Sequence, residues 1–272
     1  MSLPSSEALI HSAFYKFTRL DDVSAYVRQL RHLTLDLHGS ILLAPEGLNG
    51  MVAGSATAVQ AFEAALTALP AFSGTAFKHS ACKTTPFYKM KVREKPEIVP
   101  LGISGVDATR GTGINVSPAE WRELIRQDDV VLLDNRNSFE YRLGRFKNAI
   151  DPGVAHFRDF PDYVKAHVDE WKASGKRVAM YCTGGIRCEK TSAWMREFEL
   201  PVYQLEGGIL NYFQQLTDAE RDWEGECFVF DNRIALDTHL SETTTTLEEV
   251  YQDEPDGAWR LRRARQLQNN DG

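Results

Sequence analysis

The sequence predicts a two-domain α/β protein, because short apolar strands alternate with amphipathic helices along most of its 272 residues. That length exceeds one typical domain and is ample for two. One alternation fills residues 1–100 and a second fills 114–220, and the stretch 101–113, rich in glycine and threonine, is typical of a linker. Polar, acidic and basic runs without periodicity predict a partly disordered C-terminal extension at 221–272.

The first domain begins with a predicted strand at 8–17 and a helix at 21–33, with Asp21 or Asp22 as N-cap. Short strands at 39–44 and 50–53, a helix at 55–69 and a strand at 75–79 follow. The order β-α-β-β-α-β is that of a ferredoxin-like, or acylphosphatase-like, α+β sandwich.

Residues 87–96 form a basic segment that does not fit this pattern. In an extended chain successive side chains alternate between faces, so Lys89, Lys91, Arg93 and Lys95 share one face. Four cations on one ribbon are candidates for binding RNA phosphates. The competing interpretation is a solvated edge strand whose lysines prevent edge pairing, and the sequence supports the two about equally.

The second domain begins with the helix start Ser117-Pro118-Ala119-Glu120, which places serine at the N-cap, proline at N1 and glutamate at N3. Short apolar strands at 130–134, 178–181 and 202–205 alternate with helices at 160–173, 189–198 and 208–216. This alternation predicts a mostly parallel sheet. Ligands of such sheets bind beyond the carboxyl ends of the strands, which is where Cys182 falls.

The hexapeptide from Cys182 to Arg187 follows the strand at 178–181 and precedes a helix. Backbone N–H groups of such a loop and the helix dipole favour a thiolate over a thiol. Arg187 adds a fixed positive charge, so the loop is a cradle for an anion carried on sulfur. We therefore expect Cys182 to be the nucleophile and Arg187 to stabilise the anion. The remaining residues of the predicted active-site loop are Thr183, Gly184, Gly185 and Ile186.

Three further residues near this loop have weaker signals. Asp134 and Arg136 lie at the end of another strand, and we expect them to order the loop or to pair with each other. Cys188 is either a partner that resolves an oxidised Cys182 or a buried structural thiol, and the structural role is favoured. The seven histidines show no ligand pattern and no cysteine pair has C-x-x-C spacing, so no metal site is expected.

Composition narrows the functional classes. A formal net charge of −7 argues against a wholly basic nucleic-acid binder, although it permits a local basic patch. No stretch approaches the roughly 20 apolar residues of a membrane helix, and the first residues lack a signal-peptide pattern. We expect a cytoplasmic protein that has no membrane partner and keeps its four cysteines as thiols.

Residues 114–216 resemble a rhodanese, or sulfurtransferase, domain. The matching stretches are 132–136, 139–141, 144–149, the loop at Cys182 and 205–208. In that family the loop cysteine carries a persulfide held by loop amides. Four residues separate Cys182 from Arg187, as in sulfurtransferases, whereas related phosphatases carry five. The resemblance therefore favours sulfur chemistry over phosphate-ester hydrolysis.

A broader resemblance covers residues 8–233. The stretches 44–50, 89–93, 181–190 and 227–233 are similar to the TrhO family, whose members are rhodanese-domain, oxygen-dependent tRNA uridine(34) hydroxylases. The resemblance implies an oxidoreductase that forms 5-hydroxyuridine at the wobble position of tRNA, with molecular oxygen as co-substrate and tRNA, not DNA, as partner. No other cofactor is identifiable from the sequence. The chain departs from many members in having no cysteine after Cys227.

Two rival functions stay open at this point. The first is a sulfurtransferase that moves sulfane sulfur from thiosulfate or a persulfide to an acceptor. The second is a non-catalytic RNA- or protein-binding module built on the rhodanese fold.

Overall fold

The computed structural model describes residues 9–268, which form two compact units. The first unit contains residues 9–98 together with 230–233 and 262–268. The second unit contains residues 99–229 and 234–261. No helix within residues 9–268 has both the length and the apolar character required to cross a bilayer.

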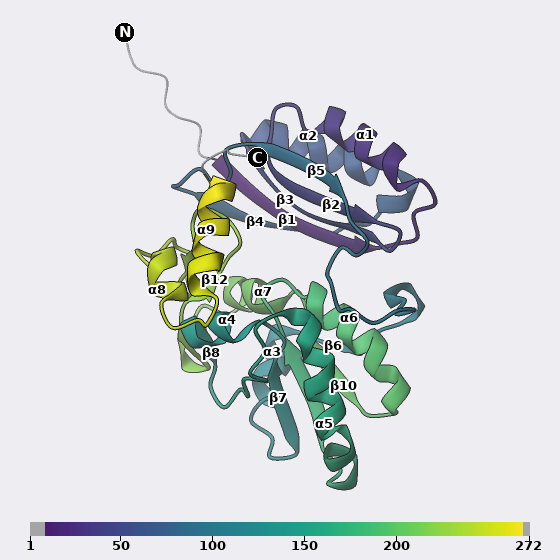
Figure 1. Ribbon diagram of the computed structural model, residues 1–272, viewed down its shortest axis with the longest axis vertical. Coiled ribbons are helices and arrows are strands. Elements are labelled where there is room, and N and C mark those ends of the chain that lie inside the picture. Colours follow the sequence, from purple (N-terminus) through teal and green to yellow (C-terminus); the bar gives the residue numbers. More distant parts are fainter. Residues whose placement is uncertain (1–8, 269–272) are drawn as a thin grey trace. The chain divides into compact units, whose positions relative to one another are not determined.

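A five-stranded sheet with two helices on one face forms the first unit (Figure 1). The strand order is β4-β1-β3-β2-β5. The predicted β-α-β-β-α-β arrangement is confirmed, and a fifth strand, β5, is added beside β2 in parallel orientation. The elements are β1 (Leu9–Phe17), α1 (Val23–Leu33), β2 (His38–Ala44), β3 (Gly47–Gly54), α2 (Ala56–Thr67), the 3-10 turn η1 (Pro70–Phe72), β4 (Phe77–Cys82) and β5 (Met90–Glu94).

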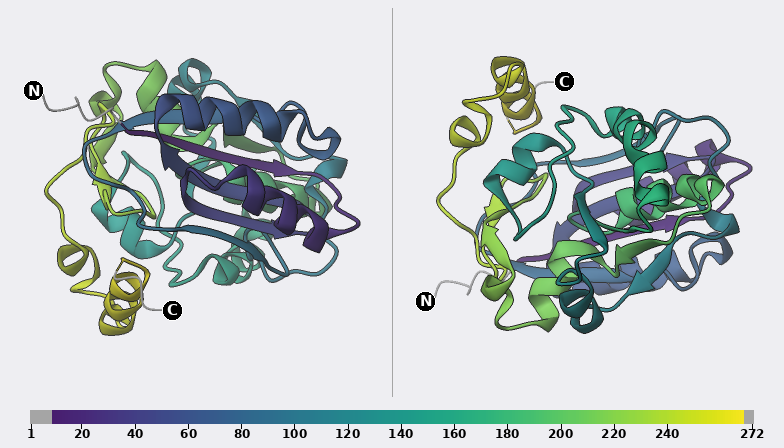
Figure 2. Two further views of the ribbon diagram at one scale, coloured as in Figure 1. Left: turned by 90° about the horizontal axis from the view of Figure 1, so that it is seen from above. Right: turned by 90° about the horizontal axis from the view of Figure 1, so that it is seen from below.

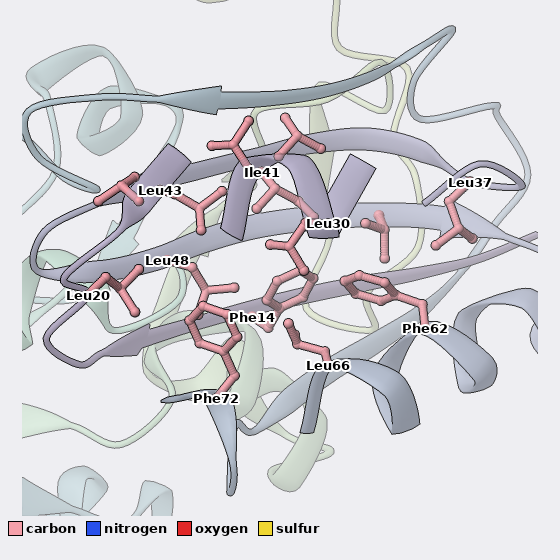
Figure 3. Close-up of a cluster of buried hydrophobic side chains, with 14 of the residues drawn as sticks. Phe14, Leu20, Leu30, Leu37, Ile41, Leu43, Leu48, Phe62, Leu66 and Phe72 are labelled. Carbon is pink, nitrogen blue, oxygen red and sulfur yellow. The ribbon is translucent and has the colours of Figure 1, made fainter. Parts of the chain in front are cut away.

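The core of this unit lies between the sheet and helices α1 and α2, which cover one face of the sheet (Figure 2). Phe14 of β1 packs against Phe62 of α2 with ring centroids 5.5 Å apart. Leu30 of α1 and Ile41 of β2 are completely buried in the same cluster (Figure 3). The N-cap of α1 is Asp22, whose carboxylate accepts a hydrogen bond from the Ala25 N–H. One face of the sheet is therefore committed to the core.

A four-stranded parallel sheet forms the centre of the second unit, with strand order β6-β10-β9-β7. The mostly parallel sheet expected from the sequence is confirmed. Its elements are β6 (Ile114–Val116), α3 (Pro118–Leu124), β7 (Val130–Asp134), α4 (Ser138–Leu143), β8 (Gly144–Phe146), α5 (Phe160–Ala173), β9 (Arg177–Tyr181), α6 (Ile186–Met195), β10 (Val202–Leu205) and α7 (Gly208–Gln215). The 3-10 turns of this unit are η2 (Ala108–Arg110), η3 (Phe157–Asp159), η4 (Arg196–Phe198) and η5 (Ala219–Arg221).

Local sequence signals fix several of these helices. The predicted capping box at the start of α3 is present, with Ser117 and Glu120 bonded reciprocally to each other's backbone. Helix α5 has the bounds expected from the pattern. Helix α6 begins at Ile186, earlier than expected, because Gly185 adopts a left-handed N-cap conformation with φ 99°. Arg187 therefore lies in the first turn of α6.

The extension at 221–272, expected to be partly disordered, contains five regular elements within the residues that the structure describes. Its elements are β11 (Trp223–Gly225), β12 (Cys227–Phe228), β13 (Ala235–Leu236), α8 (Leu247–Tyr251) and α9 (Gly257–Gln268). Helix α8 has a capping box formed by Thr246 and Glu249. It buries Tyr251, whose ring lies 5.1 Å from that of Phe139 in α4. Strand β11 pairs with β8, β12 pairs with β13, and α8 packs on α4, which are tertiary contacts that periodicity does not reveal.

Residues 230–233 belong to the first unit, although the residues on either side of them belong to the second. Asp231 pairs with Arg233 at 2.6 Å and approaches His11 of β1 to 3.5 Å. Arg233 also donates a hydrogen bond to Ser80 Oγ of β4 at 2.7 Å. Burial and the Arg233 charge lower the pKa of His11 to about 3, against the opposing effect of Asp231, so its imidazole is neutral at pH 7.

Candidate active site around Cys182

Cys182 directly follows β9 and precedes the first turn of α6, as the sequence predicts. Its side chain is buried, with 1% of its surface exposed. The Gly185 N–H donates a hydrogen bond to the sulfur at 3.1 Å. The left-handed Gly185 aims this N–H inward, which a residue with a Cβ adopts only with strain. The loop is therefore shaped around an acceptor at the sulfur position.

The electrostatics of the loop favour the thiolate. Burial by itself would raise the pKa of Cys182, but a hydrogen bond from the Cys188 thiol, the charge of Arg187 and backbone N–H groups of Cys188 and Gly185 together hold it well below its usual value. These contacts favour the thiolate form of Cys182. A buried thiol with a lowered pKa at the carboxyl end of a parallel strand is suited to nucleophilic or sulfur-carrying chemistry.

Arg187 does not point freely at the sulfur. Its guanidinium forms a two-pronged ion pair with Glu140 of α4, with N–O distances of 2.7 and 2.8 Å. The Glu140 side chain is fully buried, and burial would raise its pKa, but Arg187 holds it below the usual value. Arg187 thus stabilises the thiolate through its charge while Glu140 fixes its position. Sequence reasoning did not select Glu140, whose local signal is the capping box with Asn137 at the start of α4.

Cys188 lies on α6 facing the same sulfur. Burial and the hydrogen bond to Cys182 raise the pKa of Cys188 well above its usual value, so it remains a thiol and donates. The amide of Asn135 contacts the Cys188 sulfur at 3.9 Å and donates to Thr191 Oγ1 at 2.9 Å. Cys188 is therefore a positioning residue for the thiolate. The sequence had favoured a buried structural thiol without contact to the Cys182 sulfur.

The N-terminus of α7 also holds the loop through hydrogen bonds to its backbone. The N–H groups of Ile209 and Leu210 donate to the carbonyls of Cys182 and Thr183 at 3.0 and 3.2 Å. Gly208 has φ 72°, and a Cβ there would lie 2.4 Å from the Cys182 carbonyl oxygen. Glycine at this position therefore permits a close approach of the two backbone segments. The loop conformation is therefore held by two helix N-termini, those of α6 and α7.

Asp134 and Arg136 pair with each other, one of the two roles expected for them. Both are fully buried, and the guanidinium bonds the carboxylate at 2.8 and 2.5 Å. Arg136 also donates to the Gly144 carbonyl and lies over the rings of Tyr181 and Trp223. The pair therefore links the end of β7 to Tyr181 at the end of β9, the residue before Cys182.

The basic segment belongs to the first unit, whereas Cys182 belongs to the second. Strand β5 is the edge strand of its sheet, as the edge-strand interpretation predicts. The cations of this segment also repel one another. Burial and the charges of Arg93 and Lys89 lower the pKa of Lys91. A groove lined by Arg31 of α1, by Thr34 and Leu35 directly after that helix, and by Met90 to Arg93 of β5 runs along this edge. Arg31 is a cation of this edge that sequence reasoning missed.

Comparison with known proteins gives two domain matches. Residues 9–98 match the family described as UPF0176 acylphosphatase like domain, and residues 117–215 match the rhodanese-like domain. Two curated relatives, both named tRNA uridine(34) hydroxylase, come from the Paris and Corby strains of Legionella pneumophila. Each is 42% identical over 246 residues, covering 89% of this chain and 96% of the relative.

Proposed function

Since the chain belongs to the family of these tRNA uridine(34) hydroxylases, we propose that it hydroxylates the uridine at position 34 of tRNA, with Cys182 as its reacting thiolate. The observation that carries this proposal is the match over nearly the whole chain, which includes both domains. The site geometry adds a buried thiolate held by the Gly185 N–H, the Cys188 thiol and the Arg187 charge. The protein is thereby proposed to be an oxidoreductase acting on RNA in the cytoplasm.

The proposed reaction takes molecular oxygen as co-substrate. Converting the C5–H bond of uridine into C5–OH inserts one oxygen atom, and the other leaves as water after accepting two electrons and two protons. We assign those electrons to Cys182 and Cys188, which are joined by a hydrogen bond. Oxidation of the Cys182 thiolate and the Cys188 thiol to a disulfide releases two electrons and one proton, and the second proton comes from solvent.

The chain's own residues then have separate parts. The amide of Gly185 and the thiol of Cys188 hold charge on the Cys182 sulfur, and burial keeps water from it. Glu140 keeps the Arg187 guanidinium beside the loop. For tRNA binding we propose the cations of the basic segment, Lys89, Lys91, Arg93 and Lys95, as contacts for backbone phosphates.

Nucleoside mass spectrometry tests the proposal directly. A strain lacking the protein is complemented with the wild type, with Cys182→Ser, or with Cys82→Ser as matched control, and its tRNA is digested and analysed. Cys82 is a half-buried thiol on β4 of the first unit. Wild type and Cys82→Ser should restore 5-hydroxyuridine in an oxygen-dependent manner, whereas Cys182→Ser should not.

The rival functions give different results. Thiosulfate-dependent sulfur transfer by the purified protein, with unchanged tRNA in the deletion strain, would select the sulfurtransferase. Restoration of 5-hydroxyuridine by Cys182→Ser would remove the thiolate from the reaction and favour a binding role for the loop. Salt titration adds a measure of phosphate contact, because each neutralised cation should reduce the slope of log affinity against log salt by about 0.7 to 0.9.

A further inference from the structure

Two rows of side chains cross the face of the first sheet opposite α1 and α2. The strand register places Lys78, Ala13, Met51, Ser40 and Lys91 side by side in the first row. The second row is Tyr15, Asn49, Leu42 and Arg93. Side chains alternate along a strand, and the intervening residues fill the core beneath the helices. We call these nine residues the helix-free face.

The helix-free face is not a second core. None of its nine residues is buried, and Arg93 is exposed. Tyr15, Met51 and Leu42 place aromatic and aliphatic surface near its centre, and the ring of Phe17 lies 6.1 Å from that of Tyr15. Such half-exposed apolar side chains on strands that also carry cations are typical of a binding surface.

The charge of this face has one sign. Neither row contains a carboxylate. The ammonium of Lys78 lies 5.3 Å from the centre of the Tyr15 ring. Within residues 9–268, Lys91 and Arg93 form no ion pair with a carboxylate. The face therefore presents positive charge at the two edges of the sheet and apolar surface between them.

This combination suits single-stranded RNA. Unstacked bases bind to proteins by stacking on aromatic rings, while Lys and Arg contact the flanking phosphates. Four strand spacings of about 4.8 Å separate Lys78 from Lys91, so the row spans about 19 Å. A duplex hides the faces of its bases and would meet only the cations. A protein partner with acidic side chains would use the cations but would not require the aromatic ring.

We propose that the helix-free face binds unstacked nucleotides of the tRNA substrate, with Tyr15 stacking on a base and Lys91 and Arg93 contacting phosphates. The identity of the RNA rests on the proposed function, because position 34 lies in the single-stranded anticodon loop. The face adds base recognition to a segment whose sequence indicates phosphate contact alone. Through this face the first unit would bind both the bases and the phosphates of single-stranded RNA.

The test measures binding rather than catalysis. Full-length Cys182→Ser protein, which lacks the reacting thiolate, is titrated into a fluorescently labelled anticodon stem–loop RNA and into a blunt duplex with the same number of phosphates. Tyr15→Leu, which keeps apolar volume but removes the ring, should weaken loop binding roughly 5- to 150-fold and leave duplex binding unchanged. Tyr15→Phe should bind like the parent.

A charge control accompanies these variants. Lys91→Gln should lower the salt slope of loop binding by about 0.7, whereas Arg28→Gln should leave it unchanged. Arg28 is exposed on α1, on the other side of the same unit. Circular dichroism melting establishes that each variant is folded. Should Tyr15→Leu fail to fold, Tyr15→Phe and Lys91→Gln still decide the outcome through loop affinity and salt slope.

Several outcomes would overturn the inference. They are unchanged loop affinity in folded Tyr15→Leu, equal losses for loop and duplex, loss of loop binding in Tyr15→Phe, an unchanged salt slope in Lys91→Gln, or Tyr15-dependent self-association without RNA binding. Its failure is separable from that of the proposed function. Loop binding without 5-hydroxyuridine formation by the wild type would retain the helix-free face and reject the hydroxylase, and the reverse result would reject the face alone.

Discussion

Replacing a member of the buried ion pair of Glu140 and Arg187 should change both the stability of the protein and the reactivity of the Cys182 thiol, and the two effects can be measured separately. Replacing Glu140 with glutamine keeps the shape of the side chain but leaves the Arg187 guanidinium buried without its counter-charge. Removing one partner of a buried ion pair costs about 3 to 5 kcal/mol. Both side chains are at least nine-tenths buried, so solvent screens little of this interaction. We expect Glu140→Gln to lose about 3 kcal/mol of unfolding free energy.

Urea denaturation followed by tryptophan fluorescence measures this loss. The chain has five tryptophans, and all five belong to the second unit, so their emission reports on the unit that contains the pair. With a slope of about 2 kcal/mol per molar urea, a loss of 3 kcal/mol lowers the midpoint by about 1.5 M. Asp129→Asn is a matched control, because Asp129 pairs with Arg177 at 2.7 Å while half-exposed. Exposed pairs contribute little to stability because solvent screens them, so Asp129→Asn should leave the urea midpoint almost unchanged.

The pKa of the Cys182 thiol should shift in opposite directions when Arg187 and when Glu140 is replaced. Arg187→Met removes positive charge and raises the pKa of the thiol, so its alkylation by iodoacetamide begins at higher pH. Glu140→Gln removes negative charge and lowers that pKa further. Both variants lose stability. A shift of the thiol pKa in the same direction in both, or a Glu140→Gln protein as stable as wild type, would refute the assigned roles.

Three further variants test other parts of the structure. Cys188→Ala removes the S–H donor and should raise the pKa of Cys182, measured by alkylation rate against pH, whereas Cys188→Ser keeps a donor and should shift it less. Gly208→Ala should abolish 5-hydroxyuridine formation, scored by mass spectrometry, because its Cβ would meet the Cys182 carbonyl. Acid should destabilise the first unit by up to about 5 kcal/mol between pH 6.5 and about 3. In this range His11 binds a proton in the unfolded chain but not in the folded protein. Circular dichroism melts of His11→Gln should lack that pH dependence.

Local patterns were sufficient for the architecture. Period-two strands and amphipathic helices predicted both sheets, and the Ser117 capping box and the bounds of α5 followed from side chains acting on their nearest neighbours. The short helix α8 escaped prediction because five residues are too few to show a period. It is stabilised by burial of residues such as Tyr251, which depends on what the rest of the chain places beside it.

The site residues were likewise predictable only where their signal lies within one short stretch of sequence. The loop from Cys182 to Arg187 is continuous in sequence, so its residue types and spacing revealed it. Glu140 escaped selection because its ion pair with Arg187 joins residues 47 positions apart. Its role at the start of α4 already explained a glutamate there. The register that aligns Tyr15 with Arg93 across four strands is likewise a property of the assembled sheet.

The pairing of Arg187 also bears on the choice between sulfur and phosphate chemistry. A loop that binds a phosphate dianion needs positive charge free to meet it. Here Glu140 compensates the Arg187 charge, and the Cys182 anion depends first on the Cys188 thiol and then on the Arg187 charge and backbone N–H groups. That arrangement suits one negative charge localised on sulfur. The same conclusion followed from the four-residue interval between Cys182 and Arg187, so loop length and charge balance independently favour a thiolate or persulfide over a phosphoryl group.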